Sequence, residues 1–376
     1  MAVAAPGETA AGGHNAIYPS NGSRTVKKWI MAPLLAFALS PVHAQPLNVA
    51  NWNDYIDPAV LADFTRETGI EVNYRTYDSD QEVYALLKQG EALDVVVPST
   101  DNFGKLIREG LLRPYAAASL PGFEALEPLI MARVAGQDPT HEYGVPYLWG
   151  SIGLAVNVPQ AEAALGGPVP NTWGLVFAKA LLARLSACGV SLLDSANDVT
   201  SLLANYQGRS LGTAGEAYVS RVLEQLGRLR PHYRYIDSSR YVDDLGSGKL
   251  CVSMAWTGDA LAAAAKGLPV KFMVPEEGSL VFVDILAIPA AAKNPEEAQA
   301  FIRYMLRPEV SARIARATYY QTPNARARQA LEAEGGSVQA ARLSADMFGY
   351  QAPREEVGKL IDDFWPRLLE NRVGGR

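Results

Sequence analysis

Apolar and polar segments alternate at short spacing behind residue 44, and the pattern predicts strands and helices in turn. Three strand–helix pairs are expected first, with strands at 47–51, 70–74 and 93–97 and helices at 58–68, 82–89 and 102–109. Pro58 lies in the first turn of the first helix, and Gly69 directly follows its end. Pro is common at the start of helices and Gly just after their end. Such alternation indicates right-handed βαβ units and a parallel sheet.

A second α/β unit is predicted over about 152–282. Its strands are expected at 191–193 and 252–255 and its helices at 198–206 and 215–229, before a strand at 284–289 that returns to the first unit and a helix at 295–305. No low-complexity linker separates the two units, so strands that cross between them predict a hinged pair of lobes with a ligand cleft between them.

The predicted division has five parts. They are a leader and signal peptide at 1–44, the first lobe at 45–151 and 284–326, the second lobe at 152–283, and a C-terminal helical part at 327–376 that packs on the second lobe.

The segment before residue 45 has the order of a signal peptide. A basic run at 24–28 precedes an apolar run at 29–39 and a small-residue stretch that ends at Ala44. The apolar run is too short for a membrane span of about 20 residues. We therefore expect cleavage near Ala44 and export to the periplasm, and the upstream residues 1–22 are left out of the fold prediction.

Composition narrows the function classes. With 376 residues and 48% hydrophobic content, the chain is long enough for two cores. Its net charge of −6 disfavours nucleic acid and anionic membrane surfaces as partners. Four histidines without an HExxH motif or a His/Cys cluster give no support to a metal site, and no cofactor is expected. The chain has two cysteines, Cys188 and Cys251. An even number of cysteines is typical of exported proteins with disulfides, so these two could pair.

Aromatic side chains and carboxylates recur together along the chain. Trp52, Asp54 and Tyr55 lie within four positions just behind the leader, at a turn after the first strand. The same residue types return in four later segments, as carboxylates at 194–198, as rings at 319–324, and as both at 256–259 and 282–284. Ring faces attract an ammonium group and carboxylates add charge-assisted hydrogen bonds, so these segments predict a site for an organic cation.

At these segments the chain resembles the periplasmic polyamine-binding proteins that serve spermidine and putrescine importers of the ABC class. The similarity covers about 47–367, and its most specific motifs are at 51–55, 94–99, 143–150, 256–259, 284–289 and 322–324. The resemblance implies an α/β, two-lobed periplasmic-binding-protein fold of type II-like architecture, in which each lobe is a mixed, mainly parallel sheet flanked by helices. It further implies a ligand in the interlobe cleft, a permease partner, a monomer and no enzymatic activity.

Carried over position by position, the resemblance assigns these ligand-binding residues: Trp52, Asn53, Asp54, Tyr55, Ser99, Asp101, Asp194, Asp198, Trp256, Asp259, Phe282, Asp284, Tyr320 and Gln351. It also implies a disulfide between Cys188 and Cys251, which match the cysteines of putrescine-type relatives. Asn53, Asp101 and Ser195 depart from the usual pattern. Putrescine-type and spermidine-type features are mixed, so the preferred polyamine stays open.

A diamine carries two ammonium groups on a short alkyl chain, so a selective site needs acids at two separated ends and rings between them. Ligand contacts from both lobes predict that binding closes the lobes. With aspartate pKa values near ~4 and amine values near ~10, affinity would vary little around neutrality. Trp149 and Trp173 are interpreted as core or hinge packing residues, and Asp80 as a capping or solvated residue.

Three other functions are weighed. A glycoside hydrolase would use paired carboxylates across a cleft, but the chain has no GxSxG motif and few histidines for acid–base chemistry. A ferric-ion-binding protein of similar architecture could use the adjacent Tyr319 and Tyr320. A sensor that presents a bound polyamine to a receptor is not separable from an import protein by sequence.

Overall fold

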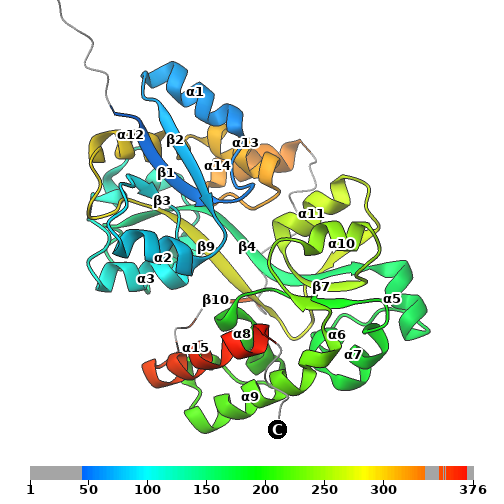
Figure 1. The fold of residues 1–376 in the computed structure, drawn as a ribbon. Coiled ribbons are helices and arrows are strands. Elements are labelled where there is room, and N and C mark those ends of the chain that lie inside the picture. The colour runs from blue at the N-terminus through cyan, green and yellow to red at the C-terminus, as the bar shows by residue number, and fades with distance from the viewer. Residues whose placement is uncertain (1–44, 335–346, 350, 352, 371–376) are drawn as a thin grey trace, which may run out of the picture. The chain divides into compact units, whose positions relative to one another are not determined.

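Two long strands, β4 (Gly144–Asn157) and β9 (Ser279–Ala287), pair antiparallel and join the two halves of the sheet (Figure 1). The structure, a computed structural model, describes residues 45–334, 347–349, 351 and 353–370. The strand order is β2-β1-β3-β9-β4-β7-β5-β6, and β10 pairs with β9 while β8 pairs with β4. Helices flank this mixed sheet, which confirms the predicted α/β class.

The first half of the sheet is built from parallel strands, as its sequence pattern predicts. It comprises β1 (Leu47–Trp52), β2 (Val72–Tyr77) and β3 (Val95–Val96), with helices α1 (Pro58–Thr68), α2 (Asp80–Lys88) and α3 (Thr100–Arg108). β1 pairs parallel with both β2 and β3. Asp57 caps α1, Ser79 caps α2 and Ser99 caps α3 through side-chain oxygens, so each helix begins where a short polar residue accepts an orphan backbone N–H.

The second half repeats the same design. It comprises β5 (Val190–Leu192), β6 (Tyr235–Ile236), β7 (Val252–Trp256) and β8 (Val270–Met273), with helices α8 (Ala196–Tyr206), α9 (Glu216–Leu229), α10 (Tyr241–Gly246) and α11 (Thr257–Ala265). β5 pairs parallel with β6 and β7, whereas β7 and β8 pair antiparallel with β4. The first turns of α8 and α11 carry Asp198 and Asp259.

The remaining elements cover the two halves. They are α4 (Pro128–Val134), α5 (Val158–Leu165), α6 (Gly174–Phe177), α7 (Lys179–Leu185), α12 (Pro295–Met305), α13 (Pro308–Thr318), α14 (Ala325–Ala333), α15 (Glu355–Leu369), β10 (Met347–Gly349) and the 3-10 turns η1 (Ala117–Ser119), η2 (Phe123–Ala125), η3 (Leu211–Thr213) and η4 (Arg230–His232). None of the helices within the described ranges is long and apolar enough to cross a membrane.

Separate hydrophobic cores form in the two halves, which are the two lobes of the fold. One core gathers buried side chains of β4 to β7 and their helices, including Trp173, and two others gather those of β1 to β3, β9 and α12 to α14. Trp149 and Trp173 are both buried, which confirms that they are core residues. α15 packs against α8 and α9, and α14 packs against α13. The predicted domain boundaries stay a prediction.

The predicted disulfide between Cys188 and Cys251 is present, with Cα atoms 5.5 Å apart. Cys251 precedes β7 and Cys188 precedes β5, so the bridge joins the starts of two parallel neighbours that lead to Trp256 and Asp198.

Reduction of this disulfide should lower the free energy of unfolding by about 2–4 kcal/mol, because it releases a loop whose ends are 63 residues apart. Thermal unfolding with and without reductant measures the loss. The Cys188→Ser/Cys251→Ser variant, which has no bridge to break, should not respond to reductant. Two titratable thiols in denatured, non-reduced protein would contradict the prediction.

Candidate functional site

Aromatic rings form a continuous path between β7, β9 and the loop after β1. Trp256 meets Phe282 edge to face at 5.2 Å between ring centroids, and Phe282 lies 6.0 Å from Tyr320. Tyr320 lies 4.8 Å from Tyr55, which in turn lies 5.8 Å from Tyr147. The path thus connects a ring of the second lobe with rings of the first, and it offers a wall of ring faces and edges to a narrow ligand.

Asp284 lies beside Tyr55, one of the inner rings of this path. Its side chain is buried, and its Oδ2 accepts a hydrogen bond of 2.5 Å from the hydroxyl of Tyr55. Burial raises the pKa of Asp284 well above its ordinary range, and the neighbouring charges of Asp80 and Asp198 raise it further. A carboxylate in this position is stabilised by a cationic partner.

Two more carboxylates lie close to Asp284. Ser195 Oγ donates to Asp198 Oδ2 at 2.6 Å, and Ser99 Oγ donates to Asp80 Oδ2 at 2.5 Å. Burial raises the pKa of Asp198 to about 6 and also raises the pKa of Asp80. Ser99 pairs with Asp284 in an isolated antiparallel bridge, so Asp80 belongs to this cluster. We name Asp80, Asp198 and Asp284 the triple-acid end.

Asp259 lies beside Tyr320, the neighbour of Tyr55 in the ring path. Its Oδ1 accepts from the Tyr320 hydroxyl at 3.0 Å and its Oδ2 from the Tyr241 hydroxyl at 2.6 Å. Burial raises the pKa of Asp259, and the charge of Asp54 adds to the rise. The Tyr320 and Tyr55 rings touch each other edge to face. Tyr320 donates to Asp259 and Tyr55 donates to Asp284, so these two rings separate the two acids.

Small residues let the rings approach the backbone. A Cβ atom on Gly258 would lie 2.3 Å from the Tyr320 ring, and one on Gly150 would lie 2.6 Å from the Phe282 ring. Thr257 Oγ1 donates to the carbonyl of Ser151 at 2.6 Å and accepts from its N–H, which fastens the start of α11 to β4. This is the physical role of the Trp-Thr-Gly-Asp segment that begins at Trp256.

The predicted residues after β1 lie on the first lobe. Trp52 Nε1 donates to the carbonyl of Val97 at 2.8 Å, and its ring lies 4.8 Å from that of Tyr77. Asn53 is exposed and donates to Asp78, while Asp54 is exposed and has a left-handed φ of 52°. Trp52 is therefore half-buried against the first lobe, Asn53 and Asp54 lie at its surface, and the following residue, Tyr55, is buried.

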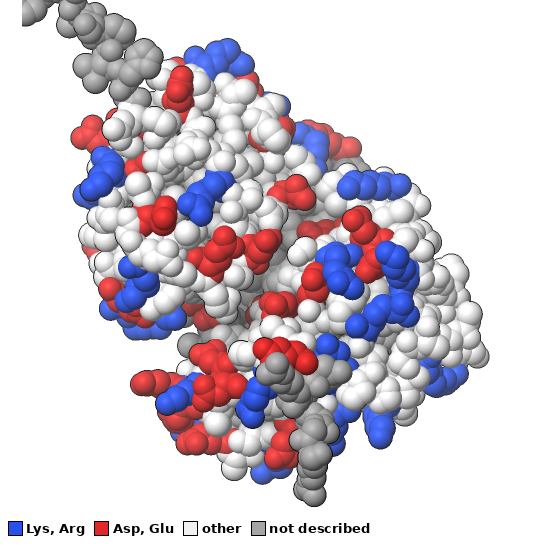
Figure 2. Space-filling model, viewed as in Figure 1, with Lys and Arg blue, Asp and Glu red and all other residues white. Residues whose placement is uncertain are grey.

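One hydrogen bond links α3 of the first lobe to α8 of the second at this rim. Asn197 Nδ2 donates to Asp101 Oδ2 at 3.3 Å. The predicted site residue Asp101 thus lies where the two lobes meet. In Figure 2, acidic side chains gather around the hollow that crosses this face of the described chain. No group of three or more His, Cys, Asp or Glu in the described ranges has the geometry of a metal site.

Two predicted residues are not brought into the cluster. Asp194 is exposed and accepts from Trp365 Nε1 at 2.6 Å, so it ties α15 to the loop before α8. Gln351 is exposed, accepts from Ser210 Oγ at 2.6 Å, and lines a cavity of about 230 Å³ together with Val281 and Val283. Alternate residues of a strand face opposite sides, so this cavity lies behind the face of β9 that carries Phe282 and Asp284.

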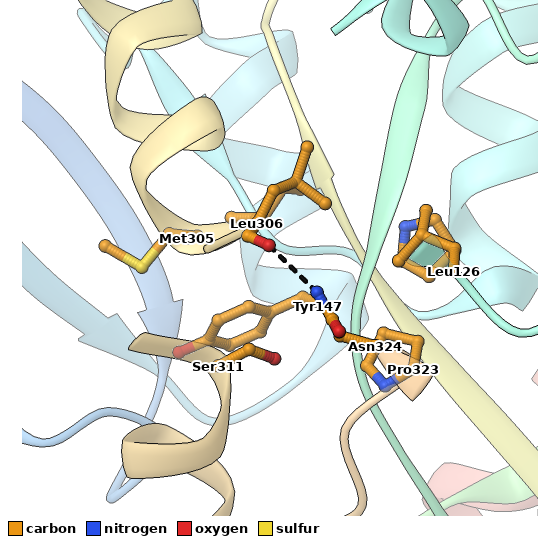
Figure 3. Close-up of a pocket in the computed structure, with 9 residues that line it drawn as sticks. Leu126, Tyr147, Met305, Leu306, Ser311, Pro323 and Asn324 are labelled. Atoms are coloured by element: carbon orange, nitrogen blue, oxygen red, sulfur yellow. Dashed lines mark hydrogen bonds between the residues drawn. The ribbon is translucent and has the colours of Figure 1, made fainter. Parts of the chain in front are cut away.

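A second, much smaller cavity lies in the first lobe (Figure 3). It has about 10 Å³ of space, room for one water molecule, between Tyr147, Met305, Leu306 and Ser311. Asn324 Nδ2 donates to the Leu306 carbonyl at 2.9 Å beside it. This cavity is too small for an organic ligand. It touches the ring path through Tyr147.

Sequence reasoning did not select Tyr241 and interpreted Asp80 as a capping or solvated residue. The interpretation of Asp80 is wrong, because Ser79 caps α2 and Asp80 instead accepts from both the N–H and the hydroxyl of Ser99. Asp80 follows a Ser at a helix start, where an acid is ordinary, and Tyr241 lies in a segment with no other site residue. Neither position carried a signal in the sequence.

Comparisons with known proteins show which family the chain resembles. The family described as bacterial extracellular solute-binding protein matches residues 59–341. The putrescine-binding periplasmic protein PotF of Escherichia coli is 33% identical over 365 residues, which cover 92% of this chain and 99% of that protein. The spermidine/putrescine-binding periplasmic protein of Salmonella typhimurium is 33% identical over 359 residues, which cover 92% of this chain and 100% of that protein.

A solved structure has the same fold over nearly the whole chain. The spermidine/putrescine ABC transporter substrate-binding protein PotD from Streptococcus pneumoniae matches with a TM-score of 0.72 at 27% identity, over 88% of this chain and all of that one. Sequence and structure comparisons therefore point to one group of proteins.

Proposed function

This chain belongs to the family of bacterial extracellular solute-binding proteins, and from that membership we propose that it captures a polyamine of the putrescine or spermidine type and delivers it to an ABC importer. The proposal rests on the fold, on the cluster of rings and acids, and on the names of the relatives. Those relatives are substrate-binding transport proteins rather than enzymes.

A pair of adjacent rings with one buried acid at each ring is the observation that carries the proposal. The Tyr55 and Tyr320 rings, 4.8 Å apart, donate their hydroxyls to Asp284 and Asp259. An alkyl chain that lies along these rings would place one ammonium group at each acid. Both acids have raised pKa values, and a cation would relieve the cost of their burial.

The ligand set that we propose divides into three groups. The acids are Asp198, Asp259 and Asp284, the rings are Trp52, Tyr55, Trp256, Phe282 and Tyr320, and the polar rim is Asn53, Asp54, Ser99 and Asp101. Asp194 and Gln351, which are hydrogen-bonded to Trp365 and Ser210, complete the proposed set. Since the set comes from both lobes, the closed state is the one that a polyamine would stabilise.

We further propose that the protein acts as a monomer in the periplasm after cleavage near Ala44, a position outside the described residues. Its importer partner would be the membrane permease. A sensor that presents the bound polyamine to a receptor would use the same site, so ligand binding alone does not separate the two functions.

Calorimetric titration of the mature protein tests the proposal. Putrescine, cadaverine, spermidine or agmatine should bind one to one, whereas butylamine, which matches putrescine except for the second ammonium, should bind at least about 100-fold more weakly. The matched pair isolates the second acid end, because hydrophobic contact is almost the same for both ligands.

Equal affinities for putrescine and butylamine would contradict the two-ended site, and no binding of any polyamine would contradict the function. Addition of ferric ion tests the ferric-binding alternative. Iron bound by Tyr319 and Tyr320 would produce a tyrosinate-to-metal absorption band, which a polyamine site would not.

A further inference from the structure

The hydroxyl of Tyr241 joins two groups of the proposed cation site. It donates to Asp259 Oδ2 at 2.6 Å and accepts a hydrogen bond of 3.2 Å from the backbone N–H of Trp256. Tyr241 is fully buried on α10, whereas Trp256 ends β7 and Asp259 lies in the first turn of α11. One oxygen atom thus fixes the ring-bearing residue and the acid relative to each other.

This contact lies at the start of the helix that carries Asp259. Trp256 is the N-cap residue of α11, and its side chain makes no capping hydrogen bond. The Tyr241 hydroxyl bonds the N–H of this N-cap residue and the carboxylate three positions later. In a capping box the acid at this third position accepts directly from the N–H of the N-cap residue, whereas here the hydroxyl of another element bridges the two.

We propose that Tyr241 is a positioning residue for ligand binding, which orients the Asp259 carboxylate and Trp256 so that the ammonium group at this end meets both. The inference rests on the proposed function. The Tyr320 hydroxyl occupies the other oxygen of Asp259, so with both tyrosines in place the carboxylate has a single orientation.

The protonation of the Asp259 carboxylate depends on the same hydrogen bond from Tyr241. The groups that face Asp259 are Tyr241 from α10, Tyr320 after α13 and Asp54 from the turn after β1. Donation from the two hydroxyls lowers the pKa of Asp259, whereas burial and the charge of Asp54 raise it. Loss of the Tyr241 hydroxyl therefore moves the pKa of Asp259 further upward, and protonated Asp259 cannot pair with an ammonium group.

The Tyr241→Phe variant tests the proposal by calorimetric titration with putrescine between pH 5 and pH 8. We expect about tenfold weaker binding at pH 7.5, the effect of one lost hydrogen bond to a charged group, and a fall in affinity that begins at higher pH than in the unchanged protein. A purely structural role of the hydroxyl would lower the melting temperature without moving the pH profile.

Tyr233→Phe is the matched control. Tyr233 is also buried in the second lobe, and its hydroxyl donates to the carbonyl of Val176 at 2.7 Å, away from the ring path. This variant should lose stability like Tyr241→Phe but keep the affinity within about twofold and the pH profile unchanged. Equal affinities of the two variants, or an unshifted profile for Tyr241→Phe, would overturn the proposal.

A double-mutant cycle gives a second measurement. In an Asp259→Ala background the Tyr241→Phe change should cost much less than in the unchanged protein, because the acid that it orients is gone. Full additivity would overturn the proposal. If the unchanged protein binds no polyamine at all, the proposed function falls first and this inference falls with it, an outcome distinct from the two above.

Discussion

Asp284→Asn should weaken polyamine binding by about 2–4 kcal/mol, roughly 30- to 700-fold in Kd. The substitution keeps an oxygen that can accept from the Tyr55 hydroxyl, so the change is confined largely to the charge. An ammonium group buried at the triple-acid end would lose its central anionic partner. Calorimetric titration with putrescine and spermidine measures the loss, and a change below about tenfold would contradict the assignment of Asp284 as a ligand residue.

Stability gives the same variant a second, independent outcome. The pKa of Asp284 in the folded protein is raised, so ionisation of this carboxylate costs folding free energy above the unfolded-state pKa. Asn has no such cost, and the ligand-free variant should melt no lower than the unchanged protein at pH 7.5. Lower affinity without lower stability is typical of a residue kept for binding.

Asp138→Asn is the matched control for this pair of measurements. Asp138 is as buried as Asp284, but its carboxylate accepts from the backbone N–H groups of Glu142 and Tyr143. An amide can accept at only one atom, so this variant should lose stability and keep its affinity. If Asp284→Asn behaved like Asp138→Asn, the acid would be a structural residue.

Helices with clear end signals were predictable from the sequence alone. α1 and α12 begin and end at the predicted residues, because Pro lies at their first turns and short polar residues precede them. The strand expected at 284–289 was wrong in its bounds, since β9 begins at Ser279 and ends at Ala287. Its first half is buried among partners far away in the chain, and the local pattern carries no sign of where such pairing begins.

The long strand β4 was not predicted at all. All 14 of its residues are buried; its first half pairs with β9, and its second half lies between β7 and β8. A strand covered on both faces shows no alternation of apolar and polar positions, so period-two patterning could not reveal it. The crossing of strands between lobes was nevertheless correctly expected.

The acids and rings of the site were found where segments repeat the same chemistry at strand ends. Trp256, Asp259, Phe282 and Asp284 stand in such segments, and the fold brings them together with Tyr320. Side chains that act through hydrogen bonds to these residues come from elsewhere in the chain. Their type is ordinary for their position, and only tertiary packing gives them a role.

Polyamine affinity should depend on pH below neutrality, unlike the flat profile expected from ordinary aspartate pKa values. Burial raises the pKa of Asp198 to about 6 and that of Asp284 well above its usual range. An ammonium group binds the ionised forms, so binding releases protons wherever the free protein holds them. As the pH rises through about 6, Asp198 ionises and affinity increases; aliphatic amines, with pKa values near ~10, stay charged throughout.

For Asp198 alone, a pKa of about 6 makes the ionised fraction about tenfold larger at pH 7 than at pH 5, and the affinity should rise by about the same factor. Protonation of Asp284 adds to this rise. Titration in buffers of different ionisation enthalpy should register proton release below pH 7, and Asp198→Asn should bind more weakly at pH 7.5 with a shallower profile. An affinity that stays constant from pH 5 to pH 7.5 would mean that neither acid pairs with the ligand, because a cation held by either carboxylate must compete with its proton.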